Sequence, residues 1–135
     1  MNNPTADSPT SGNGGSALIY VVDDEPMLLE LASAILEPCG YRVKTFQAPE
    51  AALQAFEAAQ SPPALIITDY AMHTMNGLDL VAACRRIRPA QKALLLSGTV
   101  GLDAIHDAPV QADRFLAKPY QSRQLIETVR AMLGE

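Results

Sequence analysis

The chain has 135 residues, of which 48% are hydrophobic and 19% are charged, so we expect one globular domain with a substantial core. A net charge of -5 argues against direct binding to nucleic acid or an anionic membrane, and no apolar run approaches the roughly 18 residues that span a bilayer. The two cysteines, Cys39 and Cys84, are not spaced as a zinc or disulfide motif, which favours free thiols in the cytoplasm.

The chain begins with MNNPTADSPTSGNGGS, a stretch with almost nothing to bury. Small and polar residues of this kind cannot offset the entropy lost on folding. We therefore expect residues 1–16 to be a disordered leader or linker, followed by one folded domain over residues 17–135.

From residue 17 onward, short apolar runs alternate with segments of helical periodicity. The predicted strands cover residues 17–22, 41–46, 65–68, 93–96 and 113–117, and the predicted helices begin at Pro26, at Pro49, after Gly77, near residue 102 and after Ser122 as N-cap. A strict strand–helix repeat predicts an α/β protein with three layers. We expect a doubly wound, five-stranded parallel sheet of order 2-1-3-4-5, which is the flavodoxin-like (βα)5 arrangement.

Each predicted helix carries an apolar stripe that should face the sheet. The stripe is Leu28, Leu31, Ala32 and Ile35 in the first helix, and Leu80, Cys84 and Ile87 in the third.

Polar side chains follow four of the predicted strands. Asp23 and Asp24 come after the first strand, Asp69 after the third, Ser97 after the fourth and Lys118 after the fifth. Any one of them has a simple explanation, because loops commonly begin with polar residues. The carboxyl ends of parallel strands meet at one edge, however, so we expect all of these side chains around a single crevice.

Three carboxylates this close together cannot all stay ionised without a cation, and their hard oxygen ligands suit Mg2+. Lys118 and Ser97 would then face a phosphoryl group, and Asp69 could attack phosphorus to form an aspartyl phosphate. The loop Asp23-Asp24-Glu25-Pro26 differs from the Ser/Thr/Gly-rich phosphate loop that a flavin or nucleotide needs, so we do not expect such a cofactor.

Four motifs at these strand ends resemble the receiver domain of two-component response regulators. They are VVDDEP at 21–26, DYAMHTMNG at 69–77, LSG at 96–98 and FLAKP at 115–119. The resemblance extends over about residues 17–133, and the set of motifs in this order is far more specific than any one of them.

The resemblance implies a metal site with Mg2+ as the cofactor. In this reading Asp69 is the phosphoacceptor and a metal ligand, Asp24 is a direct ligand and Asp23 acts through water. The backbone carbonyl of Ala71 completes the set.

The resemblance also assigns the groups around the phosphoryl site. Lys118 binds the phosphate, and Lys118-Pro119 is a candidate cis peptide. Ser97 is the switch hydroxyl that follows the phosphoryl oxygen. Phe115 is the aromatic residue that turns inward when that hydroxyl moves.

The implied function is a phosphorylation-activated signalling switch. The donor would be a sensor histidine kinase or a histidine phosphotransfer protein, and the target an unknown downstream protein. Such a protein catalyses only its own phosphorylation and slow dephosphorylation, so we do not class it as an enzyme. We expect no output domain, no direct DNA binding and no membrane contact in this chain, and homodimer formation stays open.

The sequence departs from the family pattern in three places. His73 stands where the family usually has proline, and it is most simply an exposed loop histidine. Ala71 replaces a residue that is often polar near the attacking water, so the phosphoryl lifetime is not predicted. Pro109 shortens the fourth helix, which puts the usual dimer mode in doubt.

Two other functions stay open at this point. One is a silent receiver used only as a protein-interaction module. The other is a Mg2+-dependent phosphohydrolase with an Asp nucleophile, but those resembling the haloacid dehalogenase group carry a DxDx[TV] pattern after the first strand, and DDEP does not match it.

Overall fold

The structure is a computed structural model that describes residues 17–98 and 102–135. Its elements are β1 (Leu18–Val22), α1 (Pro26–Leu36), the 3-10 helix η3 (Glu37–Cys39), β2 (Arg42–Phe46), α2 (Pro49–Ala58), β3 (Leu65–Asp69), α3 (Gly77–Ile87), β4 (Ala93–Ser97), α4 (Leu102–Asp107), β5 (Arg114–Ala117) and α5 (Ser122–Met132). The leader predicted over residues 1–16 lies outside the described residues.

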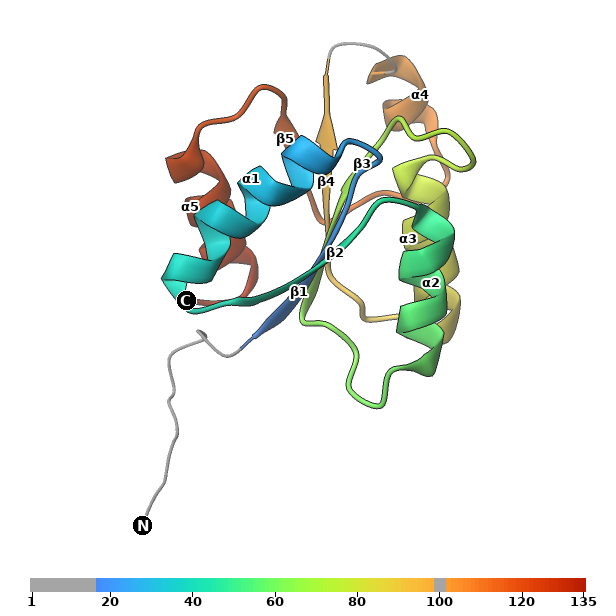
Figure 1. Ribbon diagram of the computed structural model, residues 1–135. Coiled ribbons are helices and arrows are strands. Elements are labelled where there is room, and N and C mark those ends of the chain that lie inside the picture. The colour runs from blue at the N-terminus through green and yellow to red at the C-terminus, as the bar shows by residue number, and fades with distance from the viewer. Residues whose placement is uncertain (1–16, 99–101) are drawn as a thin grey trace.

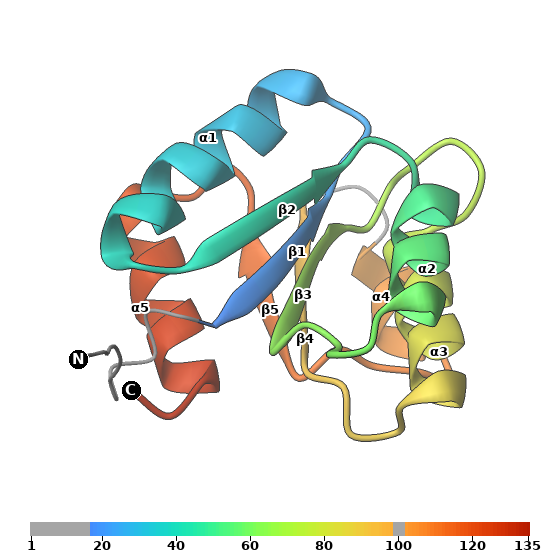
Figure 2. The same ribbon diagram turned by 60° about the horizontal axis from the view of Figure 1, so that its bottom comes forward.

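The strands form one parallel sheet of order β2-β1-β3-β4-β5, which confirms the predicted fold. Helices α1 and α5 cover one face of the sheet, and α2, α3 and α4 cover the other (Figures 1 and 2). Strand β3 lies in the middle and is buried along its whole length, whereas the edge strand β2 is largely exposed, as its alternating sequence predicts.

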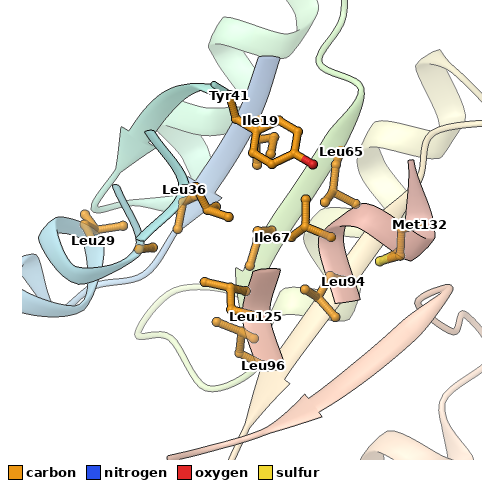
Figure 3. Close-up of a cluster of buried hydrophobic side chains, with 13 residues drawn as sticks. Ile19, Leu29, Leu36, Tyr41, Leu65, Ile67, Leu94, Leu96, Leu125 and Met132 are labelled. Atoms are coloured by element: carbon orange, nitrogen blue, oxygen red, sulfur yellow. The ribbon is translucent and has the colours of Figure 1, made fainter. Parts of the chain in front are cut away.

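Alternate residues of each inner strand face opposite layers, because side chains of a strand point to the two sides in turn. Ile19 and Val21 of β1 pack under α1 and α5, while Tyr20 and Val22 pack under α2 and α3. Figure 3 shows the first of these clusters, in which strand residues such as Ile67 and Leu94 meet Leu125 of α5. Each fully buried aliphatic side chain contributes about 1.5–3 kcal/mol, so these two layers provide most of the stabilisation.

The predicted stripe of α1 is wrong in part. The residues that the sheet buries are Leu29, Ala32 and Leu36, whereas Leu31 is 45% exposed. Positions 28, 31 and 35 have the same spacing as 29, 32 and 36, and both sets are mostly apolar, so periodicity alone could not decide which set faces inward. In α3, Leu80 and Cys84 are buried as predicted, but Ile87 is exposed because it is the last residue of the helix.

Two helix starts also differ from the prediction. The N-cap of α5 is Gln121, whose backbone N–H donates to the Gln124 side chain at 2.7 Å, so Ser122 is the first helical residue. The Asn76-Gly77 pair opens α3 directly, because the Asn76 side chain accepts from the Asp79 N–H at 2.8 Å.

No helix within the described ranges is long and apolar enough to cross a membrane.

Candidate functional site

The sheet brings the polar residues at the strand ends to one edge, as the sequence predicts. Val22 pairs with Thr68, which places the next residues, Asp23 and Asp69, beside each other. Ser97 pairs with Ala117, so Lys118 emerges next to the end of β4. Because the sheet is parallel, the carboxyl ends of these four strands, with the residues that end or follow them, lie at the same edge.

Three carboxylates form the centre of this edge. Asp23, Asp24 and Asp69 each offer an oxygen atom, and these oxygens all lie within 4.8 Å of one another. Asp23 is 3% exposed and Asp69 is 6% exposed, which is rare for aspartate without a compensating charge. An all-oxygen donor set with this spacing fits a hard divalent cation such as Mg2+.

Lys118 supplies one compensating charge. Its Nζ donates to Asp69 Oδ1 at 2.9 Å and lies 3.8 Å from Asp23 Oδ2. Burial disfavours the charged ammonium, but the hydrogen bond and charge of Asp69, together with the charges of Asp23 and Glu25, outweigh burial and raise the pKa of Lys118. The lysine is therefore cationic and directed at the carboxylate.

One lysine does not balance three carboxylates. Burial raises the pKa of Asp23 to about 6, and the charges of Asp69 and Asp24 add to this effect. The backbone N–H of Glu25, which donates to Asp23 Oδ1 at 2.9 Å, and the charge of Lys118 act in the opposite direction without cancelling it. The site therefore carries an excess of negative charge that a divalent cation relieves.

The backbone beneath Asp69 is held by the start of α3. The Gly77 N–H donates to the Tyr70 carbonyl at 2.8 Å, and a Cβ added at Gly77 would lie 2.4 Å from the Asp69 carbonyl oxygen. Only glycine allows this close approach. From the sequence we expected the third helix to begin after Gly77, and this packing role of the glycine was missed; the glycine at the start of the helix was the available signal.

The other predicted residues lie around this centre. The Ser97 hydroxyl is buried and donates to the Gly98 carbonyl at 3.2 Å, and the Ser97 carbonyl accepts from the Lys118 N–H at 2.8 Å. Phe115 is 43% exposed on β5, and Ala71 is exposed in the loop after β3. The roles expected for Ser97, Phe115 and the Ala71 carbonyl stay predictions. The Lys118-Pro119 peptide is cis, as expected.

His73 has a contact that sequence reasoning missed. Its side chain is 91% exposed, yet its Nδ1 lies 3.2 Å from Asp24 Oδ2. The sequence places His73 after β3 and Asp24 after β1, at the same edge of the sheet, but this placement alone does not predict the contact.

Comparison with known proteins agrees with this geometry. The family model of the response regulator receiver domain matches residues 19–130. A solved receiver domain protein from Clostridium thermocellum superposes with a TM-score of 0.82 at 27% identity, covering 88% of this chain and 95% of that one. The response regulator TrrA of Thermotoga maritima, solved in complex with Mg2+-BeF, gives a TM-score of 0.76 at 28% identity and covers 87% and 100% of the two chains.

Curated relatives point the same way. The response regulator receiver protein CpdR of Brucella abortus is 33% identical over 119 residues, which are 86% of this chain and 95% of that protein. The transcriptional regulatory protein KdpE of Mycobacterium tuberculosis is 31% identical over 114 residues, and the chain spans about half of its length. With a family match over most of its residues and relatives above 30% identity, the chain belongs to the response regulator receiver domain family of two-component systems.

Proposed function

We propose that this receiver domain is a phosphorylation-activated switch, in which Asp69 accepts a phosphoryl group from a phosphohistidine. The observation that carries the proposal is the setting of the Asp69 carboxylate. It is almost fully buried, an ammonium lies 2.9 Å from one of its oxygens, and two further carboxylates lie within 4.8 Å. This arrangement suits a nucleophile that must meet an anionic phosphoryl group.

Mg2+ is the cofactor we propose for the acidic edge. Asp24 and Asp69 would hold it directly, Asp23 through water, and the Ala71 carbonyl would complete the set. When bound, the cation supplies positive charge that offsets the carboxylates and the phosphoryl oxygens. The Mg2+-BeF complex of the relative TrrA supports this choice, as does the all-oxygen donor set.

The residues of the chain itself carry out the other steps. An oxygen of Asp69 forms a bond to phosphorus while the phosphorus–nitrogen bond of the donor breaks, and the donor imidazole leaves with the electron pair and takes up a proton. Lys118, which now donates to Asp69, pairs with a phosphoryl oxygen as the new bond forms. Ser97 and Phe115 then report the change, the first by following a phosphoryl oxygen and the second by turning inward from its exposed position.

The donor we propose is a sensor histidine kinase or a histidine phosphotransfer protein, and the receptor of the signal is an unidentified downstream protein. The only reactions expected of the chain itself are phosphoryl uptake and slow hydrolysis of its own aspartyl phosphate. We therefore propose a switch and not a turnover enzyme.

Intact-mass spectrometry after treatment with acetyl phosphate, with and without Mg2+, tests this function. Wild type should gain one phosphoryl group only with Mg2+, and Asp69→Asn should gain none while keeping its far-UV circular dichroism spectrum. Asp103→Asn, which changes an exposed aspartate on α4, is the matched control and should behave as wild type. A phosphoryl gain by Asp69→Asn would contradict the proposal. If wild type gains no phosphoryl group from acetyl phosphate and none from a phosphorylated kinase, the chain is better described as a silent interaction module.

A further inference from the structure

We propose that the Gln111 side chain is a latch that holds helix α4 in its resting position over the sheet and is released when Asp69 is phosphorylated. The inference rests on the proposed function, and it concerns the contact that Phe115 must overcome in order to turn inward. It starts from two hydrogen bonds, in which Gln111 Nε2 donates to the carbonyl oxygens of Ile105 at 2.7 Å and Ala108 at 3.1 Å.

Helix α4 depends on contacts from outside itself. It has only 6 residues, and helices this short are marginal without tertiary contacts. Among its described side chains only that of Ile105 is buried, where it packs against side chains of α3 and β4. In a longer helix residue 109 would donate to the Ile105 carbonyl, but Pro109 has no N–H. That carbonyl therefore accepts a 3.3 Å bond from the Ala108 N–H and the shorter bond from Gln111.

The backbone of Gln111 is fixed by two other elements. Arg85 of α3 donates from Nη1 to the Gln111 carbonyl at 2.7 Å and from Nη2 to Asp113 Oδ2 at 2.9 Å. Asp113 is joined in turn to the start of β4, because its Oδ2 accepts from the Ala93 N–H at 2.8 Å and its N–H donates to the Ala93 carbonyl at 3.0 Å. The Gln111 side chain therefore ties α4 to α3 and β4.

The strand register places Phe115 on the face of the sheet that α4 covers. Leu95 of β4 packs with Ile105 of α4 in one cluster, and Leu95 pairs with Phe115 in the parallel sheet. Paired residues of neighbouring strands point to the same face, whereas the next residue, Leu116, packs into the cluster under α1 and α5 on the opposite face. An inward turn of Phe115, which is 43% exposed here, would therefore bring its ring toward the space beneath α4 (Figures 1 and 2).

A contact that is made only in the resting arrangement opposes the switch. Protein interiors are close-packed, so a phenyl ring that enters beneath α4 requires the helix to move, and this movement breaks the two bonds of Gln111. The Ser97 hydroxyl donates to the Gly98 carbonyl in this structure, so the closed latch and the unswitched hydroxyl occur together. By linkage, the latch weakens phosphoryl binding by the same factor by which a bound phosphoryl group weakens the latch.

The affinity of the full chain for beryllofluoride, a reversible mimic of the phosphoryl group, tests the proposal at one saturating Mg2+ concentration. Gln111→Ala removes both bonds to α4 but keeps the carbonyl that Arg85 binds, so it should bind beryllofluoride about twofold to tenfold tighter than wild type. Gln111→Glu has nearly the same size but cannot donate, and it should also bind more tightly. Gln54→Ala changes an exposed glutamine on α2 and is the matched control, with the affinity of wild type.

The magnetic resonance signal of the Gln111 side-chain amide gives a second readout that does not depend on affinity. In 15N-labelled protein this signal, assigned by its loss in Gln111→Glu, should move toward that of exposed Gln54 when beryllofluoride binds. Equal or weaker affinity in Gln111→Ala, or an amide signal that does not move, would overturn the inference, while Mg2+-dependent phosphoryl uptake leaves the proposed function standing. If wild type binds no beryllofluoride and gains no phosphoryl group, both proposals fail.

Discussion

Asp23 is a site carboxylate whose charged form is disfavoured by burial and by neighbouring carboxylates. It is 3% exposed, and its pKa is raised to about 6, first because burial disfavours the charged carboxylate and then because Asp69 and Asp24 repel it. A buried aspartate with a raised pKa lowers the stability of the protein at neutral pH, because its charged form is less favourable in the folded state than in the unfolded chain.

The pH dependence follows from the direction of this shift. Between the ordinary value near 3.8 and about 6, the folded state binds the proton that the unfolded state has released. The contribution of Asp23 to the free energy of unfolding therefore falls as pH rises through this window and stays low above it. Asp23→Asn should remove that fall and raise stability at pH 7.5 by about 1–3 kcal/mol, measured by urea unfolding in EDTA.

The comparison of the two proteins at pH 4 provides the control. There the wild-type carboxyl is protonated and the two stabilities should converge. A variant that is less stable than wild type at pH 7.5 would show that the Lys118 contact of Asp23, at 3.8 Å, outweighs burial.

Most of the site residues could be predicted from the sequence. Asp23, Asp69 and Lys118 follow directly from the rule that parallel strands deliver their carboxyl ends to one edge, and the structure confirms that they meet. The contact of His73 with Asp24 could not be predicted in the same way. It depends on the course of a loop and on side-chain torsions, and neither produces a periodic pattern in the sequence.

At the scale of elements, the start of α3 controls the backbone of the nucleophile. A Cβ added to Gly77 would lie 2.4 Å from the Asp69 carbonyl oxygen and 2.9 Å from the Leu95 side chain. Helix α3 would have to move away from β3 to make room, which disturbs the loop between Asp69 and the helix.

We therefore expect Gly77→Ala to lower the free energy of unfolding by about 1–3 kcal/mol and to slow phosphoryl uptake from acetyl phosphate. Urea unfolding and the rate of mass gain measure the two effects. Gly98→Ala is the matched control, because a Cβ there meets no described atom within 4 Å. Equal stability of the two variants would contradict the packing role of Gly77.

The positions of the helices and strands could be predicted from the sequence, but the buried face of one helix could not. Strand and helix positions were predicted well, since proline marks the starts of α1 and α2 and apolar runs mark β3 and β4. The face of α1 that turns toward the sheet was predicted wrongly in part, because the helix carries two apolar stripes of equal spacing. Exposed Leu31 instead lines a cavity of about 330 Å³ with Leu28, Lys118, Pro119 and Tyr120.

At the scale of the whole molecule, folding and cation binding are linked. Asp23 and Asp24 come from the loop after β1 and Asp69 from the end of β3, so only the folded sheet assembles the three carboxylates. A ligand that binds the folded state alone stabilises it by mass action, by about 2.7 kcal/mol at a concentration a hundred times its Kd.

Mg2+ should therefore raise the thermal unfolding midpoint of wild type by several degrees and leave that of Asp24→Asn unchanged. Scanning calorimetry in EDTA and in excess Mg2+ measures this difference. Asp103→Asn on α4 should respond as wild type does, and a similar rise in Asp24→Asn would place the cation elsewhere.

Above all, we propose that Asp69 carries the phosphoryl group. Borohydride reduces an acyl phosphate to an alcohol, so a phosphorylated aspartate becomes homoserine, which peptide mass spectrometry locates. After phosphorylation in Mg2+ and reduction, we expect homoserine at position 69 and at no other position. Homoserine at Asp23 or Asp24, or a phosphoryl gain with no homoserine at all, would contradict it.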